Sequence, residues 1–172
     1  LLQRIQSHLR GSAWGAVQLR KAVLHADASW LTRSQALEMA FDAEMQRGRI
    51  AQGGIGELRG NGQLLRREVL LACGGFNEDT VTDDLDLSFR LLLGGYAVAV
   101  IWNPPVQEEP VTRWPALLRQ RQRWAEGGLQ RFLDYWPSLL SNRLTLRQQF
   151  DLLAFFLLQY ALPIATLGDL MA

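Results

Sequence analysis

Apolar residues follow a strand pattern in three short segments, residues 14–20, 63–66 and 96–101. Helical spacing of apolar positions occupies much of the chain between these segments and after them. The helices predicted from this spacing cover residues 32–47, 67–73, 82–93, about 114–135, and the chain from residue 144 onward. Strands that alternate with helices indicate an α/β fold, and helices dominate after residue 112.

Capping and helix-breaking residues predict where these elements end. Thr32 is the expected N-cap of the first helix, and Gly48 stands just past its expected end. Five glycines between residues 50 and 62 predict a loop with a short strand. Further breaks are expected at the glycine pairs 74–75 and 94–95, at Asn103-Pro104-Pro105 after the strand, at Gly127-Gly128 within the long helix, and at Pro137.

Composition narrows the class of protein. The chain has 172 residues, of which 48% are hydrophobic and 20% charged, which excludes a disordered chain. Cys73 is the single cysteine, so an internal disulfide is excluded. The net charge is only +1, but acidic residues gather between 78 and 86 and arginines gather after residue 112. Because those arginines stand beside an apolar segment and follow an acidic group, we expect no nucleic-acid partner.

Residues 152–168 form an apolar segment without a charged side chain. Its length is at the lower limit for a transmembrane helix, and Arg143 and Arg147 precede it as cytoplasmic flanking residues would. The other interpretation is a buried helix that completes the core of a small domain. Gln159 and Pro163 weaken the membrane signal, so both interpretations stay open at this stage.

The pattern divides the chain into three expected regions. Residues 1–110 are expected to be the globular part, residues 111–147 an amphipathic interfacial helical region, and residues 148–172 a truncated membrane helix. The chain begins at Leu1 rather than Met and stops just after the apolar segment. We therefore expect an internal fragment of a longer membrane protein.

Three aspartates lie at the start of the helix that Thr82 begins. A helix N-terminus favours an ionised carboxylate, and an ionised carboxylate such as that of Asp84 can accept a proton from a hydroxyl group. Asp83 points to a different face, and Asp86 has the spacing to pair with Arg90. An ordinary capping cluster explains the same residues, so catalysis and helix capping remain alternatives.

The sequence QRQRW lies on the long helix that follows. Gln120, Arg123, Trp124 and Gly127 have the spacing of one helix face. A guanidinium group matches phosphate oxygens bidentately, an indole ring can stack on a sugar or a base, and a glycine admits a close approach. An amphipathic helix at a lipid interface, with the tryptophan at the boundary, is the alternative.

Other motifs with known chemistry are not found. The GNG turn at residues 60–62, followed by arginines at 66–67, does not match a P-loop or a dinucleotide-binding fingerprint. His8 and His25 have no partner at metal-ligand spacing, so we expect no metal site formed by this chain.

The order of the motifs is more specific than any one of them. GNG with arginines, GGF, TDD at a helix start, and QRQRW before an apolar segment together resemble the inverting family 2 glycosyltransferases. The stretches GELRGNGQLLRR, CGGFNEDTVTDDLDLSFRL and QRQRWAEGGLQRFLDYW are similar to cyanobacterial members that make a glucolipid from UDP-glucose and diacylglycerol. The resemblance covers nearly the whole chain and implies the C-terminal part of a GT-A-type, Rossmann-like domain.

The resemblance implies a role for each matched residue. Asp84 matches the catalytic base that deprotonates the acceptor hydroxyl. Thr82 and Asp83 frame it, and Asp83 stands where many members have glutamate. The remaining substrate-binding residues implied are Gly60, Asn61 and Gly62 near the transferred sugar, and Gln120, Arg123 and Trp124 near the donor diphosphate and the acceptor.

The resemblance also implies a UDP-sugar donor, a diacylglycerol-like lipid acceptor and Mg²⁺ or Mn²⁺. The family's metal-binding Asp-x-Asp motif is not found, so the metal and uridine sites are expected upstream, and the isolated fragment is expected to be inactive. The expected location is an integral membrane protein with its catalytic domain on the cytoplasmic face. A processive polysaccharide synthase, which shares TDD and QxxRW, and a non-enzymatic membrane-surface module remain alternatives.

Overall fold

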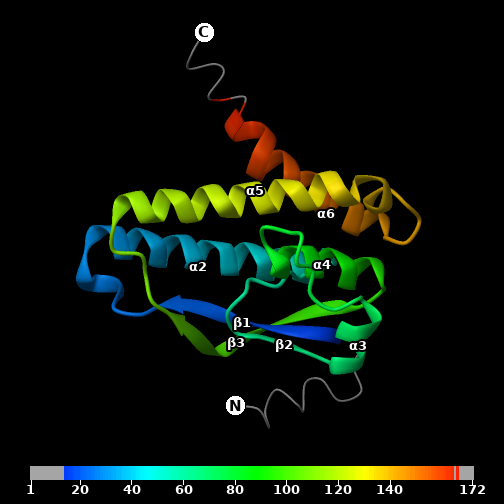
Figure 1. Cartoon of the computed structure of the whole chain (residues 1–172), viewed down its shortest axis with the longest axis horizontal. Helices are drawn as coiled ribbons and strands as arrows, with labels where there is room; N and C mark the ends of the chain where they lie inside the picture. The colour runs from blue at the N-terminus through cyan, green and yellow to red at the C-terminus, as the bar shows by residue number, and fades with distance from the viewer. Residues whose placement is uncertain (1–13, 165, 167–172) are drawn as a thin grey trace.

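The computed structural model describes residues 14–164 and 166, which form three layers (Figure 1). The first layer is a sheet with strand order β2-β1-β3. β1 (Trp14–Val23) is central, pairs antiparallel with β2 (Gln63–Leu65), and pairs parallel with β3 (Ala97–Glu108). Helices α2 and α4 cover one face of the sheet, and α5 lies on those helices (Figure 1). The predicted α/β class is confirmed.

β3 is longer than predicted. It runs through Asn103-Pro104-Pro105 to Glu108, so the prediction that these residues close the strand is wrong. Leu19 pairs with Ile101 and Lys21 with Val106, so residues 102–105 bulge out opposite a single residue of β1. In this bulge the prolines need not donate a hydrogen bond to the ladder, which removes the usual objection to proline in a strand.

α2 (Trp30–Ala51) follows the short helix η1 (Ala26–Ala28) and is also longer than predicted. Ser29, not Thr32, is the N-cap: the Ser29 hydroxyl accepts from the Thr32 amide, and the Thr32 hydroxyl accepts from the Ser29 amide. The expected cap is therefore the N3 residue of a capping box. The helix also continues through Gly48, where a side chain would meet no atom and no positive φ is required.

α3 (Arg67–Ala72) and α4 (Asp83–Leu93) have the predicted extents to within a residue. Both are followed by glycines with φ near +80°, at residues 74, 75 and 95. A left-handed residue after a helix directs the chain away from the axis, and glycine adopts it without steric cost. These helix ends are confirmed.

α5 (Trp114–Leu139) is continuous, which contradicts two predictions. Gly127 and Gly128 do not interrupt it, because Thr82 and Tyr160 pack against the space that side chains there would fill. Pro137 lies inside the last turn instead of ending the helix. A proline there removes one hydrogen bond near the end, and the buried side chain of Leu139 keeps the last turn packed.

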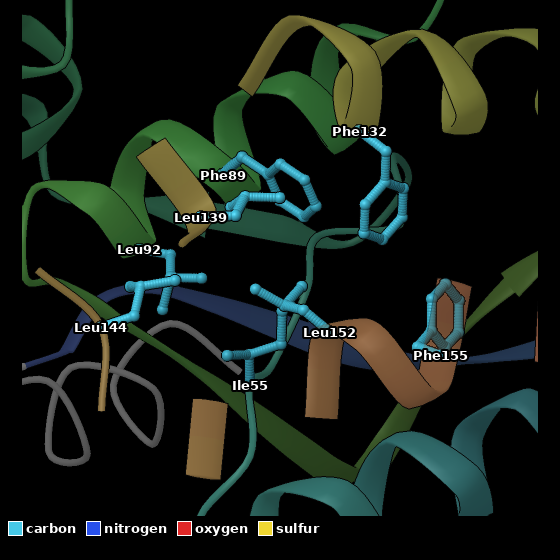
Figure 2. Close-up of a cluster of buried hydrophobic side chains, with 8 residues drawn as sticks. All are labelled: Ile55, Phe89, Leu92, Phe132, Leu139, Leu144, Leu152 and Phe155. Atoms are coloured by element: carbon cyan, nitrogen blue, oxygen red, sulfur yellow. The ribbon is translucent and has the colours of Figure 1, made fainter. Parts of the chain in front are cut away.

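α6 (Leu146–Phe156) begins with a capping box between Thr145 and Gln148 and passes into the π-helical turn η2 (Leu157–Ala161). Side chains of α4, α5 and α6 and of the preceding loops form one apolar cluster (Figure 2). Phe89 and Phe132 meet edge to face, with 5.1 Å between their ring centroids. The other members of the cluster are Ile55, Leu92, Leu139, Leu144, Leu152 and Phe155.

The apolar segment predicted at residues 152–168 is therefore partly core. Leu152 and Phe155 are buried against α5 and are not available to lipid. No helix within residues 14–164 is both long enough and apolar enough to span a membrane. Residues 165 and 167–172, which include the last part of the predicted segment, lie outside the described residues.

Candidate active site

The loop between α2 and β2 is held in place by side chains rather than by a strand partner. The side-chain amide of Gln46 on α2 accepts from the Glu57 N–H at 3.1 Å and donates to the Glu57 carbonyl at 3.2 Å. The Ser88 hydroxyl on α4 accepts from the Leu58 N–H at 2.8 Å. These bonds satisfy buried backbone groups that would otherwise lack partners.

The same loop is tied to β1 two residues further on. Gln18 is 2% exposed; its side chain accepts from the Arg59 N–H at 2.7 Å and donates to the Asn61 carbonyl at 2.9 Å. Lys21 donates to the Arg59 carbonyl at 3.2 Å. The GNG turn is thus fixed beside the carboxyl-terminal half of β1, toward the edge of the sheet where ligands bind in open α/β folds.

No motif in the sequence had singled out the supporting residues Gln18, Gln46 and Ser88. Gln18 lies between the buried apolar residues Val17 and Leu19 of β1, and a polar side chain at a buried strand position requires a partner. That pattern could have singled it out. Gln46 and Ser88 lie on helices with no local pattern that separates them from surface polar residues.

Asp84 lies in the first turn of α4, beside this loop. The Ser88 hydroxyl that accepts from Leu58 also donates to the Asp84 carbonyl at 2.8 Å. Gly60 has a φ of +75°, and a β-carbon there would lie 3.4 Å from Asp84 Oδ2. The structure therefore brings together two sites that the sequence places 24 residues apart, the GNG turn and the TDD aspartate.

The surroundings of Asp84 favour its protonated form more than water does. Burial raises the pKa of its carboxyl group, and the negative charge of Asp83 adds to the rise. The Leu85 N–H and the charge of Arg59 oppose it. A partly buried carboxylate with a raised pKa that faces a glycine turn has the properties of a general base.

The other two aspartates have different surroundings. Asp83 is exposed, whereas Asp86 is buried and pairs with Arg90 at 2.7 Å, so the predicted pairing of Asp86 is confirmed. The Tyr135 hydroxyl on α5 also donates to Asp86 at 2.7 Å. Burial, followed by this bond to a carboxylate, raises the pKa of Tyr135 to about 12. Asp86 therefore joins α4 to α5 and does not face the GNG turn.

Thr82 precedes these aspartates at the N-cap position, but its side chain makes no capping hydrogen bond. It packs against Gly127 of α5, where a β-carbon would lie 2.3 Å from Thr82 Oγ1. The TDD motif and the helix that carries QRQRW are therefore in contact through a residue without a side chain.

Two cations lie near the ring of Trp124. Arg121 Cζ is 4.3 Å and Lys21 Nζ is 5.8 Å from the centre of its rings. Lys21 also forms an ion pair with Glu108 at the end of β3, besides its hydrogen bond to the Arg59 carbonyl. One ammonium group thus connects the tryptophan of QRQRW to the loop beside Asp84.

The remaining two residues of the motif have separate environments. Gln120 accepts from Arg121 at 2.8 Å, and Arg121 pairs with Glu38 of α2 at 2.6 Å. Arg123 is exposed and forms no ion pair with another residue of the described ranges. Its guanidinium is therefore available to an anion, although it does not contact Asp84.

The residues that the structure describes do not supply a metal site. No group of three or more His, Cys, Asp or Glu side chains among them is arranged to hold a metal ion.

A cavity of about 250 Å³ lies along β3. Trp14, Tyr96, Trp102, Arg47 and the backbone of residues 97–100 contribute to its walls. None of the residues predicted for the site lines it.

Comparison with known proteins gives consistent results. The profile of a family described as "Glycosyl transferase family group 2" matches residues 2–172. The chain is 49% identical over 171 residues to a beta-monoglucosyldiacylglycerol synthase of Synechocystis sp., covering 99% of the chain and 36% of that protein. A protein of the same name from Trichormus variabilis is 53% identical over 157 residues, covering 91% and 34%. A probable glycosyltransferase of Bacillus subtilis is 30% identical over 151 residues, covering 83% and 34%. The chain spans about a third of the length of these relatives.

Proposed function

The chain belongs to glycosyl transferase family group 2, and from this premise we propose that it forms part of an enzyme that transfers glucose from UDP-glucose to a lipid hydroxyl. The names of the most similar relatives support diacylglycerol as the acceptor. The observation on which the proposal depends most is the position of Asp84, a carboxylate with a raised pKa that faces the GNG turn.

The proposed reaction is a single displacement with inversion. The Asp84 carboxylate takes the proton of the acceptor hydroxyl while that oxygen attacks the anomeric carbon of the sugar. As the new carbon–oxygen bond forms, the bond from the anomeric carbon to the donor phosphate breaks, and its electron pair leaves with the diphosphate. One base is enough, unlike the two carboxylates of a glycoside hydrolase.

Residues of α5 are proposed to bind the departing diphosphate. The exposed guanidinium of Arg123 suits bidentate contact with phosphate oxygens. Trp124, held by Lys21 and Arg121, offers a rigid ring surface to the sugar or the acceptor. Gln120 is fixed by Arg121 and can donate its amide hydrogens. Mg²⁺ or Mn²⁺ remains part of the proposal, with ligands outside the described residues.

A lipid acceptor requires contact with a membrane surface, and two exposed apolar stripes support such contact. Their members are spaced three, four or seven residues apart over most of each stripe, so each stripe follows one helix face. The stripe of α6 is Leu146, Phe150 and Leu153 and continues to Leu157 at the start of η2, and the stripe of α5 is Trp114, Leu118, Leu133 and Trp136 and continues to the C-cap Leu140. We infer an integral protein whose catalytic part lies at the cytoplasmic surface.

The test of the catalytic proposal is Asp84→Asn in the complete protein. An amide cannot take the proton, so we expect the rate of glucolipid formation to fall about 10²–10⁴-fold while donor binding persists. Asp79→Asn removes an exposed carboxylate from the same acidic segment and should have no such effect. Near-normal turnover of the Asp84→Asn variant would refute the assignment.

The product of the unmodified complete protein tests the alternative functions. Mass spectrometry distinguishes a lipid that carries a single sugar from a polysaccharide. The absence of any product would favour a non-enzymatic module.

The membrane proposal has its own test. Leu146→Glu combined with Phe150→Glu should reduce transfer to diacylglycerol in phosphatidylglycerol vesicles about tenfold or more, because charge at the stripe opposes lipid contact. Transfer to a short-chain acceptor in solution should be unchanged, as should both activities of the control Asn142→Glu. Equal loss with both acceptors, or loss with neither, would contradict the proposal. Alkaline carbonate extraction tests whether the complete protein is integral.

A further inference from the structure

Two helices and a loop supply cations to one buried carboxylate. Glu57, in the loop before the GNG turn, has no exposed surface. It pairs with three guanidinium groups: those of Arg49 on α2 and Arg59 in the loop, each at 3.1 Å, and that of Arg131 on α5 at 2.8 Å. Burial alone would raise the pKa of Glu57, but the charges of Arg131, Arg49 and Arg59 hold it well below its usual range. Glu57 is therefore a permanent anion.

Two further carboxylates complete the charge balance. Asp151 of α6 accepts two hydrogen bonds from Arg49, both at 2.9 Å. Asp42 of α2 accepts two from Arg59, at 3.1 and 3.2 Å. Three arginines thus face three carboxylates, as a buried ionic cluster requires. Arg59 has two of these carboxylates as partners, Glu57 on one side and Asp42 on the other.

Arg59 is also the member of the cluster nearest along the chain to the GNG turn. It directly precedes Gly60, the residue that faces Asp84 Oδ2. Its charge acts on Asp84 in the sense opposite to burial and to Asp83. Its backbone is fixed on both sides, since its N–H donates to Gln18 and its carbonyl accepts from Lys21, the other nearby cation. Glu57 and Asp42 therefore hold the guanidinium of Arg59 in one place, in the residue that adjoins the glycine facing Asp84.

We propose that Arg59, oriented by Glu57 and Asp42, is a positioning residue that keeps the carboxylate of Asp84 ionised for catalysis. The inference rests on the proposed function of Asp84. Without a nearby cation, a carboxylate that is partly buried beside Asp83 would hold its proton more tightly. If Glu57 and Asp42 did not compensate the charge of Arg59, the Asp84 carboxylate would lose its proton too readily to be an effective base. The cluster sets the proton affinity of Asp84 between these two limits.

The proposal predicts that opposite charge changes move the pH dependence in opposite directions. Arg59→Gln removes the cation, so Asp84 should bind its proton more tightly. The acid limb of the profile of kcat/KM against pH should then move to higher pH by about one unit. Asp42→Asn removes a carboxylate that neutralises Arg59, so the acid limb should move to lower pH. A structural role alone would lower the rate of both variants and leave the position of the limb unchanged.

The experiment measures kcat/KM between pH 4 and 9 with the complete protein and diacylglycerol vesicles. Arg59→Lys keeps the charge and should restore most of the wild-type profile. Glu44→Gln changes an exposed carboxylate of the same helix as Asp42, and its profile should match the wild type. Asp42 is used rather than Glu57 because Glu57→Gln would leave Arg131 buried without an anion, and that variant is expected to unfold. Thermal melting confirms that each variant is folded.

A lower rate for Arg59→Gln with an unmoved acid limb would overturn the proposal, and so would shifts of Arg59→Gln and Asp42→Asn in the same direction. If Arg59→Gln fails to fold, the Asp42→Asn profile decides alone: an unmoved limb refutes the proposal. Failure of the proposed function is recognised separately, because Asp84→Asn would then remain active.

Discussion

Replacement of Gly127 by alanine tests the contact between the TDD motif and the QRQRW helix. The new β-carbon would lie 2.3 Å from Oγ1, 2.6 Å from Cγ2 and 2.9 Å from Cβ of Thr82. Non-bonded heavy atoms are stable at about 3.5–4.0 Å, so α5 and the start of α4 must separate by about 1 Å. Thr82 cannot turn aside, because its own β-carbon is one of the close atoms.

The cost divides between stability and catalysis. Overpacking a buried site typically costs about 1–3 kcal/mol, and alanine gains back about 1 kcal/mol over glycine within a helix. We therefore expect the free energy of unfolding to fall by about 1 kcal/mol. The effect on rate should be larger, because a displacement of about 1 Å between catalytic groups can cost about 10²-fold.

The assay combines thermal melting of the complete protein with the initial rate of glucolipid formation. Gly48→Ala is the matched control: it makes the same substitution inside α2, where a β-carbon meets no atom. It should leave the rate unchanged and stabilise the protein by up to about 1 kcal/mol through helix propensity. Wild-type melting and wild-type activity of Gly127→Ala would refute the close α4–α5 contact.

Two other predictions concern single side chains of α5. Tyr135→Phe removes the hydrogen bond to Asp86 and should lower the free energy of unfolding by about 1–2 kcal/mol at neutral pH, as measured by urea denaturation. The pKa of Tyr135 in the folded protein, about 12, lies above the ordinary value of about 10. The stabilisation by this hydrogen bond should therefore be complete below pH 10 and lost as the pH rises toward 12. A difference in unfolding free energy between wild type and variant that does not depend on pH would contradict this prediction. Arg123→Lys keeps the charge but not the bidentate geometry, so the KM for the donor should rise several-fold in steady-state kinetics, and an unchanged donor KM and kcat would show that Arg123 is only a surface charge.

Local signals determined the type and order of the main elements. Alternating and helical spacing of apolar residues predicted β2, the first part of β3, and the greater parts of β1, α2 and α5, because side-chain burial follows the geometry of each element. The ends of α3 and α4 were predictable because glycine is the residue that adopts a left-handed conformation without steric cost. The chemical types of the candidate site residues were likewise evident from TDD and QRQRW.

Tertiary contacts overruled local signals at other points. β3 continues past its prolines because a bulge relieves them of pairing with β1. α5 continues through Gly127 because Thr82 fills the space beside it. In both elements a contact from elsewhere in the fold outweighs an intrinsic preference of tenths of a kcal/mol to about 1 kcal/mol. The start of α2 was a local choice instead: Ser29 rather than Thr32 is the N-cap, and the two residues form one capping box.

The arrangement of the site was decided by the tertiary structure alone. Asp84 and Gly60 meet because Ser88 and Gln18 hold the loop between α4 and β1, and neither residue belongs to a catalytic motif. The pattern around Glu57 and Arg59 resembles that of solvent-exposed charges, since charged residues are seldom buried. They lie in the interior because Arg49, Arg131, Asp42 and Asp151 reach the same point from three helices. Charge compensation across such sequence distances depends on how the helices pack, which no local pattern encodes.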